Sequence, residues 1–83
     1  MIAAAERKRM RAVPLCGPRV VARLESIGVE RLADLRDRDP YDLMQEVNIE
    51  AGRPIWRPPM ATRALGNLVE AAERQADPSV RSR

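Results

Sequence analysis

The residues of this chain best suited to bind a ligand are arginines beside a short turn rich in proline and glycine. Pro14, Gly17 and Pro18 mark the turn, and Arg19 and Arg23 follow it. Residues four apart lie on one face of a helix, so both guanidinium groups are predicted to share a side. The first N–H groups of a helix are unpaired and carry partial positive charge, and could bind a phosphate. An ordinary turn between two helices is the alternative interpretation.

Further basic residues precede the turn, in the first predicted helix. They are Arg7, Lys8, Arg9 and Arg11. A run of charge is most often the solvated face of a helix, and that interpretation stays open here. If these side chains bind phosphate, each contact steepens the log–log dependence of duplex binding on salt concentration by about 0.9.

Charge is divided unevenly along the chain. Residues 1–24 hold six basic side chains and one acidic one, a net charge of +5, whereas residues 25–52 hold three basic and eight acidic ones, a net charge of −5. Residues 53–83 hold six basic and three acidic ones, a net charge of +3. The positive first segment favours an anionic partner such as nucleic acid. The opposite charges also permit head-to-tail association of two copies.

The missing residue types exclude most catalytic chemistry. The chain has no histidine and one cysteine, Cys16, so it forms no internal disulfide, Cys/His zinc site or histidine-based catalytic group. Cys16 is expected to be a small buried apolar residue rather than a reactive thiol. Four aspartates lie close together in sequence: Asp34, Asp37, Asp39 and Asp42. Their positions at predicted helix ends favour capping over a magnesium site. We therefore predict no catalytic residue, metal, cofactor or small-molecule substrate.

Length and composition predict one small soluble domain. With 83 residues, no phenylalanine, one tyrosine and one tryptophan, the chain must form a single aliphatic core. No apolar run approaches the roughly 18 residues of a transmembrane helix, and residues 1–11 lack the apolar region of a secretory signal. We expect a cytoplasmic protein with no membrane partner.

Apolar periodicity, prolines and glycines predict an all-α fold, a compact bundle of about five short helices. The predicted helices cover residues 3–12, 18–28, 30–37, 40–52 and 58–76. The prolines of residues 53–59 predict a connector, with Ile55 and Trp56 packing onto the core. Gly66 lies inside the last helix, where glycine costs about 1 kcal/mol relative to alanine. Either a closely packed backbone or simple tolerance accounts for it.

Helix ends and domain limits follow from the same signals. Gly28 is placed to cap the second helix, and Asp39 followed by Pro40 is a typical helix start. Residues 1–76 are predicted to form the single domain, and residues 77–83 a disordered basic tail.

The turn and its flanking helices match a known pattern at Val13, Pro14, Cys16, Gly17 and Leu24, with Val21 where a small residue is usual. This pattern resembles the helix-hairpin-helix motif of sequence-independent DNA-binding proteins, which implies a SAM-like helical fold. Further matches are Ile27, Gly28, Val29, Leu32, Leu35, Arg38, Asp39, Pro40 and Leu43. With them the chain is similar to a family of small bacterial proteins called pathogenicity-locus proteins, also labelled mitomycin-resistance proteins. The resemblance covers residues 10–52 and does not extend to the last helix.

In helix-hairpin-helix proteins, hairpin amides contact phosphate oxygens, neighbouring basic side chains add charge, and some hairpins hold a monovalent cation through carbonyl groups. The resemblance implies backbone contacts at Leu15, Gly17 and Arg19, with side-chain support from Arg19 and Arg23. Leu15 departs from the family, because the strongest DNA-binding hairpins have glycine there. It either limits the approach of the backbone or inserts into the minor groove as an apolar wedge. We therefore expect weak binding.

The expected function is that of a non-enzymatic accessory module that binds DNA weakly and without sequence preference. The predicted binding residues are Leu15, Gly17, Arg19 and Arg23, with Arg7, Lys8 and Arg11 of the first helix. The alternative is a protein-interaction module that associates through its basic and acidic segments. A titration with labelled duplex and a measurement of self-association at two salt concentrations separate these hypotheses.

Overall fold

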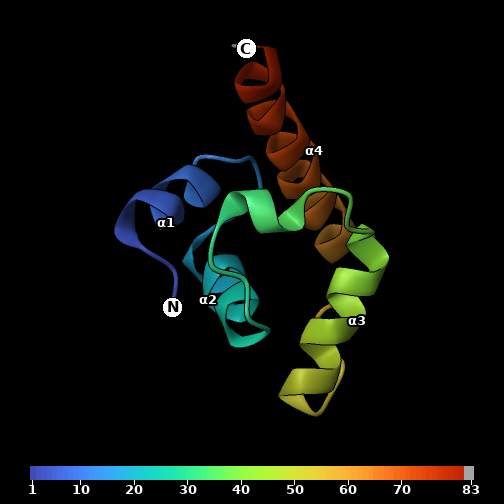
Figure 1. Ribbon diagram of the computed structural model, residues 1–83. Helices are drawn as coiled ribbons and strands as arrows, with labels where there is room; N and C mark the ends of the chain where they lie inside the picture. Colours follow the sequence, from blue (N-terminus) through green and yellow to red (C-terminus); the bar gives the residue numbers. More distant parts are fainter. Residues whose placement is uncertain (82–83) are drawn as a thin grey trace.

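The chain folds into helices throughout the part that the structure describes (Figure 1). The computed structural model describes the backbone of residues 1–81 and the side chains of residues 1–75. The elements are α1 (Ala4–Arg11), α2 (Pro18–Ser26), the 3-10 helix η1 (Leu32–Leu35), α3 (Pro40–Ala51) and α4 (Met60–Arg81). Residues 1–81 contain no strand, which confirms the all-α prediction. The third predicted helix is a 3-10 turn, so residues 1–81 contain four α-helices rather than about five.

A glycine in the left-handed region ends α2. Gly28 has a φ of +93°, and its N–H donates to the carbonyl of Glu25 at 3.1 Å. The N–H of Val29 donates to the carbonyl of Leu24, also at 3.1 Å. These two bonds form a Schellman motif, which satisfies carbonyl groups that the helix leaves unpaired. The predicted cap at Gly28 is confirmed.

Side-chain and glycine caps likewise set the ends of α3. The carboxylate of Asp39 accepts hydrogen bonds from the N–H groups of Tyr41 at 2.8 Å and Asp42 at 3.3 Å. Gly52 adopts a φ of +80° at the other end. The helix start predicted at Asp39 is therefore confirmed.

The helix predicted over residues 30–37 is wrong in type and length, because only η1 forms there. The Asp34 carboxylate accepts hydrogen bonds at 3.0 Å from the N–H groups of both Glu30 and Arg31. Short side chains that bond nearby amides compete with helical hydrogen bonding in this way. Asp37 then adopts a φ of +65°, outside the helical region.

The last helix is longer than predicted. It begins at Met60 and its backbone stays helical to Arg81. Residues 70–76 are all strong helix formers, as expected for the predicted part of this helix, and the helical backbone continues past residue 76. The predicted tail 77–83 thus begins inside α4, and residues 82 and 83 lie outside the described residues.

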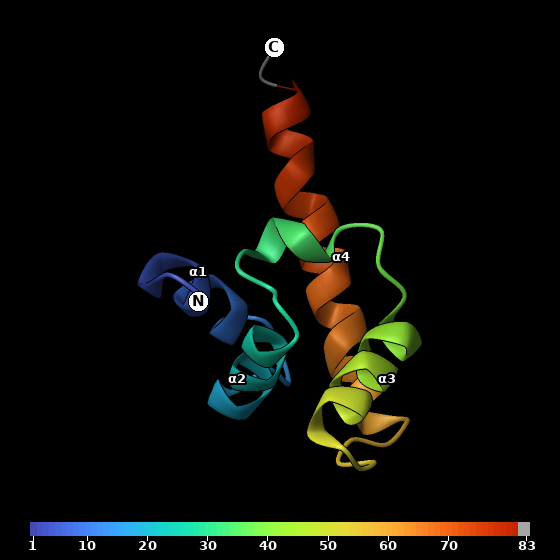
Figure 2. The same ribbon diagram turned by 60° about the horizontal axis from the view of Figure 1, so that its bottom comes forward.

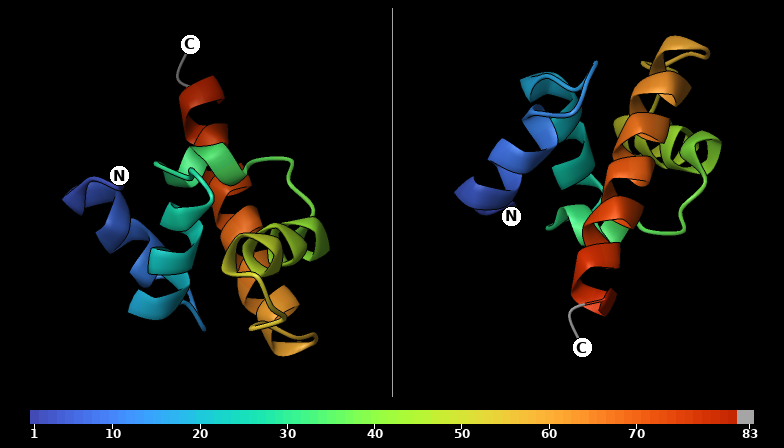
Figure 3. Two further views of the ribbon diagram at one scale, coloured as in Figure 1. Left: turned by 90° about the horizontal axis from the view of Figure 1, so that it is seen from below. Right: turned by 90° about the horizontal axis from the view of Figure 1, so that it is seen from above.

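The long helix α4 lies between the other elements, with α1 and α2 on one side and α3 on the other (Figures 2 and 3). It packs against both η1 and α3. The largest fully buried side chains are Met10, Val21, Leu24, Leu35, Leu43, Val47, Leu65 and Leu68. The core is therefore aliphatic, as its composition predicts. No helix within the described residues is both long enough and apolar enough to span a bilayer.

Gly66 lies where α4 passes the start of α3. A Cβ added to Gly66 would lie 3.8 Å from the Cγ of Pro40, an ordinary van der Waals distance. Of the two explanations that the sequence leaves open, the structure supports tolerance. Within residues 1–81, no backbone approaches closely enough to require glycine.

Candidate nucleic-acid interface

The hairpin that joins α1 to α2, residues 13–17, contains one tight turn. The N–H of Cys16 donates to the carbonyl of Val13 at 3.1 Å, and Leu15 adopts a φ of +70°. A proline followed by a residue with positive φ is the pattern of a type II turn, which favours glycine at the second place. The left-handed conformation costs an ordinary side chain about 1–2 kcal/mol. Leu15 therefore occupies a glycine position, and its side chain is 50% exposed.

Four backbone amides at this hairpin donate no hydrogen bond to any described residue. They belong to Leu15, Gly17, Arg19 and Val20. Gly17 is the N-cap of α2, and no side chain of residues 1–75 caps the helix. The N-terminus of α2 is therefore open, with partial positive charge and unpaired donors at one place.

Gly17 is not required by the fold itself. Its φ of −93° and ψ of −173° are extended values that any residue adopts. A Cβ added there would meet no other atom of the described residues within 4 Å. The missing side chain therefore leaves free space at the N-terminus of α2, where a ligand can approach the backbone closely.

Two residues hold the hairpin against α4. The side-chain amide of Asn67 donates to the carbonyl of Pro14 at 3.0 Å. Cys16 is buried, with its Sγ 3.4 Å from the carbonyl of Ala64, and burial raises the pKa of its thiol to about 11. The thiol is therefore protonated and shielded near neutral pH, which supports the buried apolar role predicted for it. The sequence analysis missed Asn67, because 53 residues separate it from its partner.

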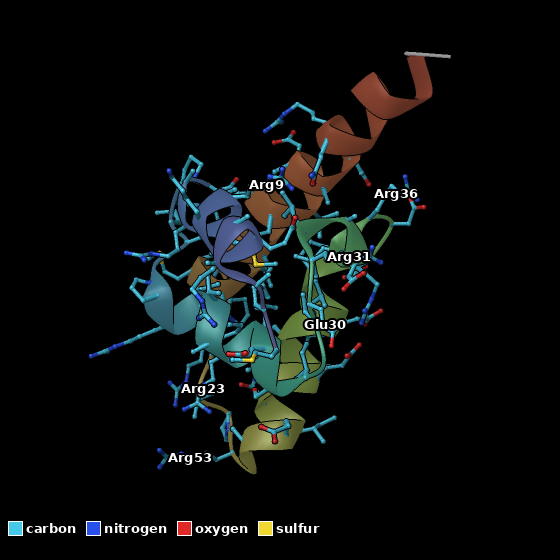
Figure 4. The ribbon with its side chains drawn as sticks, turned by 60° about the vertical axis from the view of Figure 1, so that its left-hand side comes forward. Arg9, Arg23, Glu30, Arg31, Arg36 and Arg53 are labelled. Carbon is cyan, nitrogen blue, oxygen red and sulfur yellow. The ribbon has the colours of Figure 1, made fainter. Side chains whose placement is uncertain are left out.

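Arg19 and Arg23 lie next to the hairpin on α2. Together with Ala22 and Ser26 they line an open hollow of about 540 Å³, whose other wall is formed by Ile55 and Trp56. Figure 4 shows Arg23 and Arg53 on the same side of the molecule, although they come from α2 and from the connector after α3. The connector thus brings further positive charge to the face that carries the hairpin arginines.

The connector is fixed in place by α3. The side chain of Asn48 donates to the carbonyl of Trp56 and accepts from its N–H, both at 3.0 Å. Trp56 is half-buried, with Arg53 and Arg57 on either side of it in the chain. The sequence predicts that Trp56 packs onto the core but assigns no binding role to these residues. Their signal in the sequence is the pair of arginines that flanks the only tryptophan.

The basic side chains of α1 differ in whether they form ion pairs within the fold. Arg7 lies 3.6 Å from the carboxylate of Glu25 and donates to the carbonyl of Ile2 at 3.4 Å. The N–H of Ile2 donates a hydrogen bond to the Glu25 carboxylate, and this bond lowers the pKa of Glu25 below its usual value. The positive charge of Arg7 lowers that pKa further. Arg9 pairs with Glu6 at 2.6 Å. Both arginines are therefore engaged within the fold.

Lys8 and Arg11 are exposed and form no ion pair with any described residue. Arg11 is the last residue of α1, at the end that leads into the hairpin. Of the predicted basic residues, Arg11 ends the helix before the hairpin and Arg19 and Arg23 belong to the helix after it, whereas Arg7 lies against Glu25.

The acidic residues serve other purposes. Asp34 and Asp39 bind backbone amides at the ends of η1 and α3, and Arg38 pairs with Glu46. In the part of the chain that the structure describes, no three acidic or cysteine side chains are grouped closely enough to hold a metal ion. In Figure 4, Glu30, Arg31 and Arg36 lie on the side away from Arg23.

Comparison with protein-family models, with curated proteins and with solved structures finds no match to this chain. The resemblance to helix-hairpin-helix proteins therefore stays a prediction that depends on the residues of the hairpin and on their geometry.

Proposed function

We propose that this protein binds DNA without sequence preference, through the phosphate backbone, with the hairpin and α2 as a helix-hairpin-helix element. The observation that carries the proposal is that the amides of the hairpin and of the first turn of α2 lack hydrogen-bond partners among the described residues, next to a glycine with free space around it. A phosphate oxygen is a suitable acceptor for such amides, and the partial charge of the helix end favours an anion. Arg19 and Arg23 supply full charges next to it.

The expected affinity is low. Three or four phosphate contacts give a log–log salt slope of about −3 on duplex DNA. Non-specific complexes of this kind have dissociation constants of about 10⁻⁴ to 10⁻⁶ M at physiological salt. No base-reading helix is needed, because phosphate contacts carry no direct sequence information. An accessory role, not catalysis, fits these properties.

The test is a titration of fluorescent duplex DNA at several salt concentrations. The double variant Arg19→Glu/Arg23→Glu is expected to abolish binding that the parent protein shows at low salt. The control is Arg31→Glu/Arg36→Glu, which makes the same charge change on the side away from Arg23. If the parent does not bind at low salt, or if both double variants weaken binding equally, the proposal is wrong.

Self-association is a second candidate function, favoured by the exposed face of α3. Ile49 is 79% exposed there. Asp42 and Glu46 precede Ile49 by seven and three residues, and this helix spacing places both acidic residues on the same side as Ile49. An acidic face with an exposed apolar side chain at its edge complements the basic face beside the hairpin. Sedimentation without DNA at low and high salt tests this function, which predicts salt-sensitive dimers or chains that Ile49→Gln weakens.

A further inference from the structure

An apolar hollow of about 440 Å³ lies directly beside the hairpin. Its walls come from the hairpin, α2, the connector and α4. The apolar residues that line it include Leu15, Val20, Trp56, Pro58, Met60 and Ala61. Its volume lies within the range of about 300–1,000 Å³ that is usual for small-molecule sites.

The rim of this hollow carries apolar side chains that the fold does not bury. Leu15 is 50% exposed and Met60 is 63% exposed. Leu15 also holds the left-handed backbone conformation at a position where glycine or asparagine would be less strained. The apolar side chain of Leu15 thus lies at the opening of the hollow, although its exposure to water and its left-handed backbone conformation are both unfavourable.

Positive charge borders the apolar surface. Arg57 belongs to the wall of the hollow, and Trp56 and Ile55 separate it from the neighbouring hollow that Arg19 and Arg23 line. Among the described residues, no aspartate or glutamate lines either hollow. The occupant that fits this surface has a flat or compact apolar part and a negative charge a short distance away.

We propose that the hollow receives an unpaired nucleobase, so that the preferred substrate is DNA with a single-stranded end or gap. This inference rests on the proposed function, because the phosphates on either side of the base would bind the hairpin amides and the arginines. A nucleotide presents an apolar face and an anionic group in one unit. Base stacking on aromatic side chains tolerates any base, which agrees with walls that offer few polar groups.

An amphipathic helix from a protein partner fits the hollow less well. Such a helix needs a groove that takes apolar anchors over two turns. The residues that line the hollow form one pocket against the start of α4, whereas the neighbouring hollow has arginines along its α2 wall. Charge and shape together favour a nucleotide.

The only tryptophan of the chain reports directly on this site. The experiment compares three DNAs: a blunt duplex, the same duplex with an overhang of three thymidines, and the same duplex with an overhang of three abasic nucleotides. Each overhang is placed at the 5′ end in one set of substrates and at the 3′ end in another. The two overhangs carry equal phosphate charge and differ only in the bases. We expect the thymidine overhang to bind about tenfold more tightly than the abasic one. Trp56 also lines the hollow of Arg19 and Arg23, so its fluorescence should respond to all three DNAs, but the thymidine overhang should quench it most.

The outcomes separate this inference from the proposed function. Equal affinities for the thymidine and abasic overhangs, with both still dependent on Arg19 and Arg23, overturn the base site and leave phosphate binding intact. No binding of any DNA overturns both. Quenching of Trp56 that grows with the concentration of the full-length protein without DNA, and that Ile49→Gln removes, assigns the hollow to a second copy of the chain and also overturns the base site.

Variants of the hollow complete the test. Ala61→Leu places a larger side chain on the wall from α4, and should remove the tenfold advantage of the thymidine overhang while blunt-duplex binding is retained. Ala5→Leu makes the same change on the exposed face of α1 and should have no effect. Leu15→Asn replaces the apolar side chain at the rim by a residue that tolerates the left-handed region. It should also reduce the advantage of the thymidine overhang over the abasic one. Folded variants at both positions that keep the full advantage overturn the proposal.

Discussion

The replacement Gly17→Asp is expected to change stability and DNA binding in opposite directions. Gly17 is the N-cap of α2, and the amides of Arg19 and Val20, at the second and third helical positions, lack partners among the described residues. The extended backbone of Gly17 suits an aspartate, and the space for a side chain is free. An aspartate there can accept hydrogen bonds from the two amides that are proposed to bind phosphate.

The expected magnitudes follow from capping and from the helix dipole. Aspartate exceeds glycine as an N-cap by a few tenths of a kcal/mol, and a negative charge at a helix start adds about 0.3–1 kcal/mol. A total of about 1 kcal/mol raises the melting temperature by about 4–8 °C for a domain of this size. DNA binding should weaken at least tenfold, which is about 1.4 kcal/mol, because the carboxylate both occupies the amides and repels phosphate.

Thermal melts by circular dichroism and duplex titrations at low salt measure the two effects. Gly17→Asn is the matched control, since it has the same shape without the charge, and it should raise stability by only a few tenths of a kcal/mol and weaken binding less. A Gly17→Asp protein that melts higher and still binds duplex as tightly as the parent would refute the role given to the hairpin amides. A lower melting temperature would contradict the open N-cap.

Three further predictions concern the fold around the site. Gly66→Ala should raise the free energy of unfolding by about 1 kcal/mol, because a Cβ there only touches Pro40; a destabilised variant in denaturant titrations would disprove the tolerance of this position. Cys16 has a folded-state pKa of about 11, above its unfolded value, so its contribution to stability is complete below about pH 8.5 and is lost as the pH rises toward 11. Stability measured from pH 8 to 11 should therefore fall more steeply for the parent than for Cys16→Ala, and parallel curves would contradict burial of the thiol. Asn67→Ala should lower the free energy of unfolding by about 0.5–1 kcal/mol through the lost hydrogen bond to Pro14, and a stability equal to the parent's would show that this bond does not hold the hairpin.

The features that the sequence predicts correctly are those that nearby residues decide. Asp39 needs only the two amides that follow it, and Gly28 needs only the preceding turn of helix. Competition between side-chain and helical hydrogen bonds also explains the wrong prediction for residues 30–37. The Asp34 carboxylate accepts hydrogen bonds from the amides of two preceding residues, and only a 3-10 turn forms. That outcome depends on one side-chain conformation, which apolar periodicity does not reveal.

The candidate site likewise has a part that nearby residues decide and a part that depends on contacts between distant segments. The amides and arginines of the hairpin and α2 are contiguous in sequence, so their proximity can be predicted from the chain alone. The connector reaches the same face only because Asn48 binds Trp56 and because α4 returns past the hairpin, where Asn67 meets Pro14. Contacts of this kind join distant segments, and so the hollow beside Leu15 could not be predicted from residue spacing.

The measurement that tests the central proposal most directly is a titration of the isotope-labelled protein with duplex DNA at low salt, followed by amide nuclear magnetic resonance. Phosphate binding at the hairpin predicts that the largest shifts fall on the amides of Leu15, Gly17, Arg19 and Val20, and that added salt reverses them. Shifts confined to α3, or no shifts at DNA concentrations near one millimolar, would contradict it.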